Sequence, residues 1–282
     1  MHRIISSRNS TKLLPIERSL THLAVLFCLQ DFKWVLPLDE WETQAINYTS
    51  GTTGRPKGVC YSHRGAALNA MNQVVVWGMP QHPTYLWSLP MFHCNGWTFP
   101  GTVTLMNGTH VCLRSVDAPS ILGAIGAANV THLCGAPIIM NMLVHSSPEL
   151  QQNLTHRDAT LPPVKMFTAG APPPAAVIAG MEQLGVDVTH VYGLTETYGP
   201  SVSNPWNEEQ WGGKSAAEKA LLKARQGVTY PLNEARVVDD KGKEVPKDGV
   251  TVGEIMMRGN IVMKGKPLFV QSCIYGDCYN NC

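Results

Sequence analysis

The chain has 282 residues, and its 22 lysines and arginines against 21 aspartates and glutamates give a formal net charge of +1. This balance excludes a globally basic surface of the kind that attracts nucleic acid or anionic membranes. Hydrophobic residues make up 44% of the chain and charged residues 15%, which excludes an intrinsically disordered chain and predicts a substantial buried core.

Residues 1–40 carry no pattern that assigns them to a domain. The best apolar run, Leu23–Leu29, is interrupted by Gln30 and Asp31, far short of the ~18 residues of a membrane-spanning helix. Basic residues before this run leave a secretory signal or a mitochondrial transit peptide open, but no cleavage pattern follows it. We therefore favour an ordinary N-terminal segment. Five cysteines scattered singly through the chain are typical of an intracellular protein: Cys28, Cys60, Cys94, Cys112 and Cys134.

The most specific segment is Tyr48–Val59, with the sequence YTSGTTGRPKGV. Its glycines lack a Cβ, so backbone N–H groups can close around phosphate oxygens, and Lys57 adds a charge that can reach terminal phosphates. Gly58 follows this lysine where the P-loop of GTPases has serine or threonine, so the segment is not that loop. The sequence predicts a phosphate-binding loop, with a flexible surface turn as the alternative. The predicted phosphate contacts before the lysine are Thr49, Ser50, Gly51, Thr52, Thr53 and Gly54.

Short apolar runs typical of β-strands alternate with helical patterns further along the chain. The predicted strands are Thr84–Leu89, Thr109–Leu113, Val130–Cys134, Val164–Thr168 and Val188–Tyr192. Helices are predicted after Ser62 (with apolar residues Leu68, Met71 and Val75), after Asp117, at Pro137, and from Pro173 to Gly185. The alternation predicts βαβ units, and hence an α/β fold with a mainly parallel sheet flanked by helices.

The pattern changes after Pro205. Ser215 and Glu218 form a capping-box pair before a helix that we expect to end at Gly227. The β-like stretches Glu234–Val238 and Glu254–Arg258 predict a small antiparallel β appendage. We expect an α/β core over 41–205, a helix-plus-antiparallel subdomain over 206–265, and an aberrant tail over 266–282. Its cysteines, an incidental feature rather than a metal cluster, are Cys273, Cys278 and Cys282.

Five segments together resemble the motifs of the adenylate-forming (AMP-binding) enzyme superfamily, in that family's order. Tyr48–Val59 resembles its phosphate loop, and Pro90–Trp97, PMFHCNGW, resembles its substrate-gate motif. Ala169–Pro174, AGAPPP, resembles its adenine-binding turn, and Tyr192–Thr197, YGLTET, its second nucleotide motif. Gly253–Gly265 resembles the strand pair that ends the large domain. The gate motif PMFHCNGW and the second nucleotide motif, with its continuation YGLTETYGP, look most like those of plant short/medium-chain or aromatic acyl-CoA ligases.

The resemblance implies that a carboxylate attacks the α-phosphorus of ATP to give acyl-adenylate and pyrophosphate, before coenzyme A accepts the acyl group. It implies that Thr49–Lys57 hold the β- and γ-phosphates, that Glu196 binds Mg²⁺, and that Thr195 contacts the α-phosphate. Tyr192 and Gly193 would lie at the nucleotide, with Tyr192 against the adenine. The backbone edge of the adenine slot would be formed by Gly170, Ala171 and Pro172.

The same resemblance places an acyl pocket around His93, Trp97, Gly193 and Tyr198, with His93 near the carboxylate. His93 could alternatively be a packed core histidine. The catalytic residues implied are thus Lys57, His93, Thr195 and Glu196. Neither the gate motif nor the second nucleotide motif supplies a cation or a buried acid that could bind a polar tail of the substrate. We therefore expect an apolar carboxylic acid as the substrate.

Residues after Gly265 match none of the family's ribose-binding motif, hinge or C-terminal domain with its catalytic lysine. We therefore expect that domain to be absent, adenylation to be slowed and thioester formation to be lost. Such an ending would fit a frameshift, a retained intron or an incomplete gene model. Three functions stay open: an acyl-CoA ligase core, a luciferase-like or peptide-synthetase adenylation unit, and a truncated, inactive nucleotide-binding protein. We expect a cytoplasmic protein, with mitochondria or peroxisomes open for a full-length form.

Overall fold

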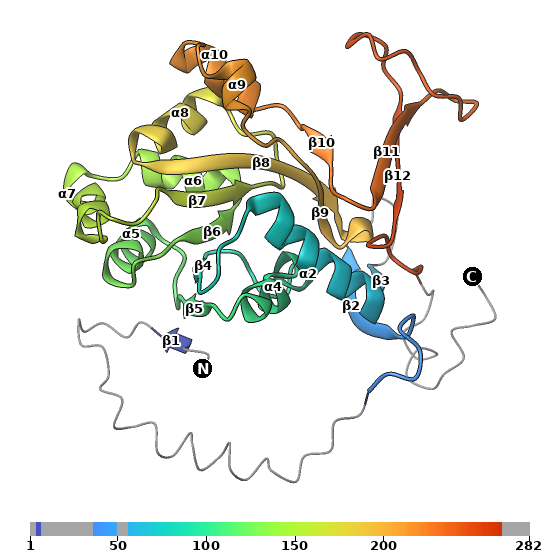
Figure 1. The fold of residues 1–282 in the computed structure, drawn as a ribbon, viewed down its shortest axis with the longest axis horizontal. Coiled ribbons are helices and arrows are strands. Elements are labelled where there is room, and N and C mark those ends of the chain that lie inside the picture. The colour runs from blue at the N-terminus through green and yellow to red at the C-terminus, as the bar shows by residue number, and fades with distance from the viewer. Residues whose placement is uncertain (1–3, 7–35, 50–55, 267–282) are drawn as a thin grey trace.

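The computed structural model describes residues 4–6, 36–49 and 56–266 (Figure 1). In this part of the chain an eight-stranded sheet has the order β1-β5-β4-β6-β7-β8-β9-β10. Neighbouring strands from β1 to β8 are parallel, whereas β9 and β10 are antiparallel. The strands are β1 (Ile4–Ser6), β4 (Thr84–Trp87), β5 (Thr109–Cys112), β6 (His132–Gly135), β7 (Val164–Thr168), β8 (Val186–Leu194), β9 (Gly199–Ser203) and β10 (Val228–Thr229). The mainly parallel α/β fold is therefore confirmed.

The predicted parallel strands are all present; Val164–Thr168 matches β7 at both ends, the others have shifted ends, and β8 differs most from its predicted range. It begins at Val186 and continues to Leu194, because its last residues pair with β9 rather than ending at Tyr192. The sequence analysis missed β9, whose five residues GPSVS contain a glycine and a proline, although all five are buried. Glycine and proline disfavour a strand locally, so tertiary burial decides this element.

Helices cover both faces of the sheet (Figure 1). Predicted starts are confirmed by their caps, since Ser62, Asp117 and Ser215 each accept a hydrogen bond from a first-turn N–H. The helix after Ser215 ends at Lys223 rather than at Gly227, because Ala224 already caps it. The longer helices are α2 (His63–Trp77), α4 (Phe99–Leu105), α5 (Ala118–Ala127), α6 (Pro137–Val144), α8 (Ala175–Gln183) and α10 (Ala216–Lys223). The short ones are α3 (Cys94–Trp97), α7 (Pro148–Gln151), η2 (Gln152–His156), η3 (Thr195–Thr197) and α9 (Glu208–Trp211).

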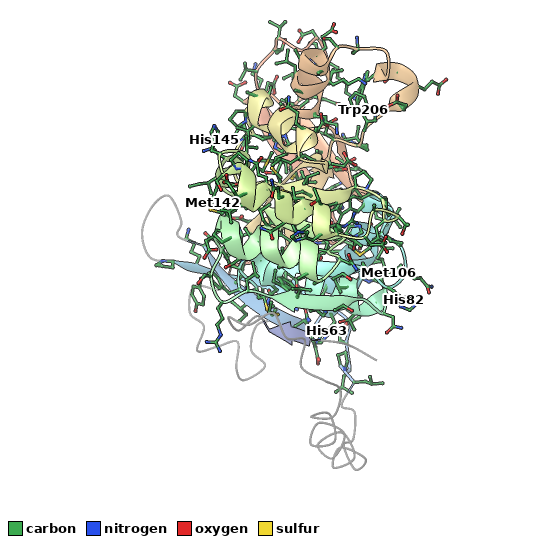
Figure 2. All side chains as sticks on the ribbon, turned by 90° about the vertical axis from the view of Figure 1, so that its left-hand side faces the viewer. His63, His82, Met106, Met142, His145 and Trp206 are labelled. Carbon is green, nitrogen blue, oxygen red and sulfur yellow. The ribbon has the colours of Figure 1, made fainter. Side chains whose placement is uncertain are left out.

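Two hydrophobic clusters lie on opposite faces of the sheet. Side chains alternate between them along a strand, as in β7, where Met166 joins one cluster and Phe167 the other. The first cluster is aliphatic and packs the sheet against α5, α6 and α8; these helices face the viewer in Figure 2, with His145 just after α6. The second is aromatic and includes residues of α2 and α4, such as Trp77 and Phe99.

Helix α2 has a polar inner face, which its sequence does not suggest. Met71 and Val75 of the predicted apolar residues are 45% and 68% exposed, whereas Asn69, Asn72 and Gln73 are buried. The buried amides bond to distant segments: Asn69 Nδ2 donates to the Tyr198 carbonyl at 2.9 Å, and Gln73 Oε1 accepts from the Tyr230 hydroxyl at 3.1 Å. Partners far along the chain therefore decide which face of α2 is buried.

Two hairpins complete the fold. β2 (Thr43–Thr49) pairs antiparallel with β3 (Lys57–Ser62), and β11 (Asn233–Val238) pairs antiparallel with β12 (Glu254–Gly259). The second hairpin confirms the predicted antiparallel pair and projects away from the sheet (Figure 1). Within the described ranges, no helix has both the length and the apolar character needed to cross a membrane.

Candidate active site

The two predicted nucleotide motifs meet at one edge of the sheet. β7 and β8 are parallel, and their register aligns Thr168 with His190. The AGAPPP segment follows β7 directly, and Tyr192 and Gly193 lie in the last part of β8. Because parallel strands end at the same edge, the turn at Gly170 lies beside the YGLTET segment. Gly170, Ala171 and Pro172 are exposed, and Tyr192 and Gly193 are half-buried, so this edge is accessible to a ligand.

Two glycines of this edge are required for different reasons. Gly170 has φ +90°, a left-handed conformation that favours glycine, and open space surrounds the position of a Cβ. At Gly193 a Cβ would lie 1.9 Å from the Gly199 carbonyl oxygen. Gly193 therefore lets the end of β8 approach β9, a structural requirement that holds without any ligand.

The turn η3, Thr195–Thr197, is held through its backbone. The Tyr61 hydroxyl donates to the Thr195 carbonyl at 2.7 Å, and the Met263 N–H donates to the Glu196 carbonyl at 2.8 Å. Thr197 Oγ1 accepts a hydrogen bond from the Leu194 N–H at 2.8 Å. With its carbonyls fixed in this way, the turn presents the half-buried side chains of Thr195 and Glu196.

The Glu196 carboxylate forms an ion pair with the ammonium of Lys266 through Oε1. Partial burial raises the pKa of Glu196, but the Lys266 hydrogen bond and charge and a backbone N–H outweigh it, so the pKa is lowered overall. An ionised, partly exposed carboxylate suits a hard cation such as Mg²⁺, which commonly binds proteins through one or two carboxylates. Glu196 thus fits the predicted metal role, although a lysine now pairs with one of its oxygens.

The phosphate loop is described only at its ends. Thr49 closes β2 and Lys57 opens β3, and the two residues are paired across the hairpin. Lys57 is exposed and Thr49 half-buried. The remaining predicted phosphate contacts, Ser50, Gly51, Thr52, Thr53 and Gly54, lie outside the described residues.

The predicted acyl-pocket residues occupy different surroundings. His93 is exposed, next to Phe92, which is 80% exposed, so His93 is not a packed core histidine. Trp97 is buried in the aromatic cluster beside the backbone of Gly199. The Tyr198 ring instead packs in a third cluster with Val59 and Tyr61, on the β3 side of the turn. The side chains of His93, Trp97 and Tyr198 therefore lie in three different settings, namely solvent, the aromatic cluster and the β3 contact, and Gly193 lies against β9.

A left-handed turn separates His93 from Trp97. Residues 94–98 have φ values of 43°, 45°, 59°, 48° and 68°, in chain order. Left-handed backbone costs roughly 1–2 kcal/mol for each residue that is not glycine, and such strain clusters at functional sites. Within this turn the Cys94 thiol lies 3.8 Å from Thr195 Oγ1. Sequence reasoning missed both Cys94 and Tyr61; only Gly96 signals an unusual backbone here.

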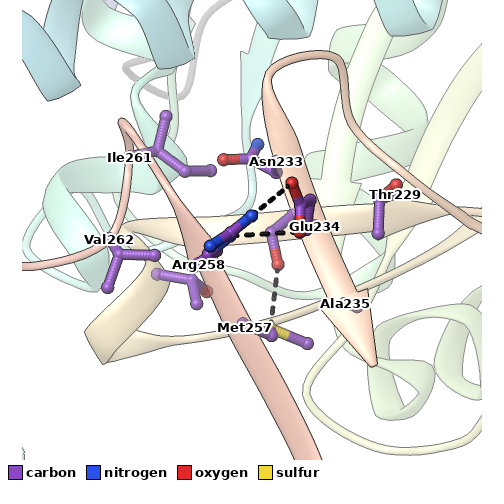
Figure 3. A pocket seen from close by; sticks show the side chains of 10 residues that line it. Thr229, Asn233, Glu234, Ala235, Met257, Arg258, Ile261 and Val262 are labelled. Carbon is purple, nitrogen blue, oxygen red and sulfur yellow. Dashed lines mark hydrogen bonds and ion pairs between the residues drawn. The ribbon is translucent and has the colours of Figure 1, made fainter. Parts of the chain in front are cut away.

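A small pocket lies between Thr197 of η3, β9, β10 and the β11–β12 hairpin (Figure 3). Arg258 crosses it, donating to Glu234 through Nε at 3.0 Å and Nη2 at 2.9 Å, and the Ser201 hydroxyl contacts Met257 Sδ at 3.4 Å. None of the predicted site residues lines it. We interpret the pocket as the joint between the hairpin and the sheet.

Comparison with known proteins points to one family. Residues 8–265 match the family described as AMP-binding enzyme. The chain is 48% identical over 237 residues to the probable acyl-activating enzyme 5, peroxisomal, of Arabidopsis thaliana, covering 83% of this chain and 41% of that protein. It is 46% identical over 240 residues to the acetate/butyrate–CoA ligase AAE7, peroxisomal, of the same plant, again covering 83% and 41%.

The fold has solved counterparts. ATP-bound MatB from Rhodopseudomonas palustris has a TM-score of 0.68 and 27% identity to the chain, over 85% of this chain and 44% of MatB. The chain thus spans about 41% of the length of the curated relatives it matches. Because the family match covers residues 8–265 and the fold agrees with it, the protein belongs to the AMP-binding enzyme family.

Proposed function

We propose that the protein is the nucleotide-binding core of an AMP-forming acyl-CoA ligase, which activates a small apolar carboxylic acid with ATP. The observation that carries this proposal is the meeting of the AGAPPP turn with the YGLTET segment, where an ionised carboxylate, Glu196, stands on a turn held by its backbone. The names of the plant relatives support the ligase class and short acids such as acetate and butyrate.

In this proposal the residues at the sheet edge neutralise charge while two anions, the carboxylate and the triphosphate, approach each other. The backbone at Gly170–Pro172 and the ring of Tyr192 hold the adenine, Thr195 binds the α-phosphate, and Lys57 binds the leaving phosphates. Glu196 holds Mg²⁺, which supplies positive charge at the phosphate oxygens. His93, which is exposed, lies near the carboxylate of the acid in this proposal.

We also propose the acceptor of the acyl group, the division of the large domain and the cellular compartment. Coenzyme A accepts the acyl group in the whole enzyme, and residues 41–205 and 206–265 form the two parts of the large domain. Two relatives carry the word peroxisomal in their names, so peroxisomes stand beside the cytoplasm as the proposed compartment.

A second function is favoured by the ion pair at Glu196. The Lys266 ammonium pairs with the predicted metal ligand, so it would oppose Mg²⁺ there, and nucleotide bound without the metal would not be turned over. Nucleotide binding without catalysis is therefore the alternative, and the two functions differ in whether pyrophosphate is released.

One experiment separates them. ATP and AMP binding is measured by titration calorimetry, and pyrophosphate release is followed with acetate, butyrate, 2-methylpropanoate and benzoate. Release that Lys57→Ala and Glu196→Gln abolish supports the ligase, provided that the exposed control variants Lys214→Ala and Glu209→Gln behave as wild type. Binding without release supports the alternative, and a chain that binds neither nucleotide contradicts both.

A further inference from the structure

The side chain of Tyr61 contacts both the first residue of the turn η3 and the residue that follows the turn. Its hydroxyl donates to the carbonyl of Thr195, the first residue of η3, at 2.7 Å. Its ring stacks on Tyr198, the residue that follows η3, with centroids 3.8 Å apart and planes at 14°. Tyr61 therefore contacts both ends of the turn although it lies 134 positions before Thr195 in the chain.

Tyr61 also belongs to the strand that leaves the phosphate loop. β3 begins at Lys57, and residues two apart on a strand share a face, so Lys57, Val59 and Tyr61 lie on one side of β3. Val59 and Tyr61 pack together against Tyr198. One face of one strand therefore links the lysine proposed for the leaving phosphates to the turn proposed for the α-phosphate and the metal.

The phenol is suited to act as a fixed donor. Tyr61 is only 1% exposed. Burial, followed by the neighbouring groups Cys94, Tyr198 and Glu196, raises the pKa of its hydroxyl far above the ordinary value. The hydroxyl thus stays protonated across the neutral range, and its hydrogen bond to the Thr195 carbonyl does not depend on pH there.

We propose that Tyr61 is a positioning residue of the adenylation site: it sets Thr195 and Glu196 at the distance from the phosphate-loop strand that a metal-bound triphosphate requires. This inference rests on the proposed function. Tyr61 acts through the turn and not on the ligand, since its hydroxyl is engaged by the Thr195 carbonyl. Its loss should affect the binding of ATP with Mg²⁺ more than that of AMP, because AMP lacks the phosphates that must span from Lys57 to Glu196.

The test is Tyr61→Phe, which keeps the stacked ring and removes only the donor. The matched control is Tyr230→Phe, since Tyr230 is equally buried and its hydroxyl donates to Gln73 Oε1 at 3.1 Å, away from the turn. Calorimetry with ATP and Mg²⁺, and separately with AMP, gives the affinities, and thermal denaturation gives the stability. We expect similar stability losses, but about tenfold weaker ATP binding and at most about threefold weaker AMP binding only in Tyr61→Phe.

Amide hydrogen exchange provides a second readout. Exchange over residues 195–198 should rise in Tyr61→Phe and stay at the wild-type level in Tyr230→Phe. Equal ATP affinity in Tyr61→Phe and wild type overturns the inference while leaving the proposed function standing, and so does equal weakening by both variants. A wild-type chain that binds no ATP overturns the proposed function and this inference with it.

Discussion

The ammonium of Lys266 lies on the carboxylate of Glu196, the residue that the family resemblance assigns to Mg²⁺. Both side chains are partly buried, so water screens the ion pair less than one on the open surface. The lysine bonds to Oε1 of the carboxylate that a divalent cation would also need, and both carry positive charge. Lys266 and the metal therefore compete for Glu196.

The first prediction follows from this competition. Lys266→Gln should strengthen divalent-cation binding, measured as Mn²⁺ affinity by electron paramagnetic resonance in the presence of ATP, by about 2–5-fold, because a partly buried pair contributes up to about 1 kcal/mol. The neighbouring variant Lys264→Gln is the control, since the Lys264 ammonium donates to the Trp41 carbonyl instead. Equal Mn²⁺ affinities in the two variants would contradict the competition.

The second prediction concerns His132, which is buried on β6. Burial, and then the charges of Lys165 and Arg157, lower its pKa from 6.5 to about 3. Between these two pH values His132 is protonated in the unfolded chain but neutral in the folded chain. The free energy of unfolding should therefore fall as pH drops from 6.5 toward 3, by about 1.4 kcal/mol per pH unit from this group. His190, also buried, has a lowered pKa and acts in the same direction.

His132→Asn tests this dependence because asparagine can still bond to Thr131 Oγ1, which lies 2.7 Å from His132 Nδ1 in the wild type. Urea denaturation at pH 7, 6, 5 and 4 should give a flatter pH dependence in this variant than in wild type, even if its stability at pH 7 is lower. His145→Gln, at an exposed histidine, controls for the loss of a histidine in general. A wild-type slope in His132→Asn would show that this group does not drive acid sensitivity.

Local signals explain what the sequence could predict. The parallel strands are buried apolar runs, and Asp117 and the Ser215–Glu218 pair cap helices through contacts three residues apart. Each of these features can therefore be recognised from a few consecutive residues. The edge where AGAPPP meets YGLTET then follows from the parallel order of β7 and β8. These elements needed no knowledge of distant partners.

Contacts between distant segments explain what the sequence could not predict. The polar inner face of α2 depends on the Tyr198 carbonyl, and the role of Tyr61 depends on Thr195, each more than a hundred residues away. The exposure of His93 follows from the left-handed turn at residues 94–98, where only Gly96 is a glycine. The ion pair of Lys266 with Glu196 joins the last described residue to the turn, and no spacing rule predicts it.

The third prediction concerns Gly193. A Cβ there would lie 1.9 Å from the oxygen and 2.5 Å from the carbon of the Gly199 carbonyl, and backbone atoms cannot yield without breaking the β8–β9 pairing. Gly193→Ala should lower the free energy of unfolding by roughly 1–3 kcal/mol and weaken nucleotide binding at the displaced turn. Gly213→Ala, where a Cβ meets open space, should stay within about 0.5 kcal/mol of wild type in urea denaturation. Wild-type stability in Gly193→Ala would mean that β9 can shift.

The fourth prediction concerns Lys223 on α10, whose side chain is 10% exposed. Its ammonium lies 2.5 Å from Glu182 of α8 and 3.0 Å from Asp187 of β8, so one lysine joins three elements. Burial alone would lower its pKa, but the two carboxylates outweigh it and raise the pKa above the ordinary value. The lysine therefore stays charged in the fold, and its pairing adds stability until the pH rises through that raised pKa.

Lys223→Met keeps the apolar stem and removes the charge. Since both carboxylates keep access to water, the expected loss in free energy of unfolding is about 1–2 kcal/mol rather than the 3–5 kcal/mol of a fully buried pair. The loss should shrink in about 0.5 M salt, because added ions screen the partly exposed pairs. Lys219→Met is the control, since the Lys219 ammonium lies 5.6 Å from the Trp206 ring. An unchanged or increased stability in Lys223→Met, measured by urea denaturation, would mean that desolvation of the lysine cancels its two ion pairs.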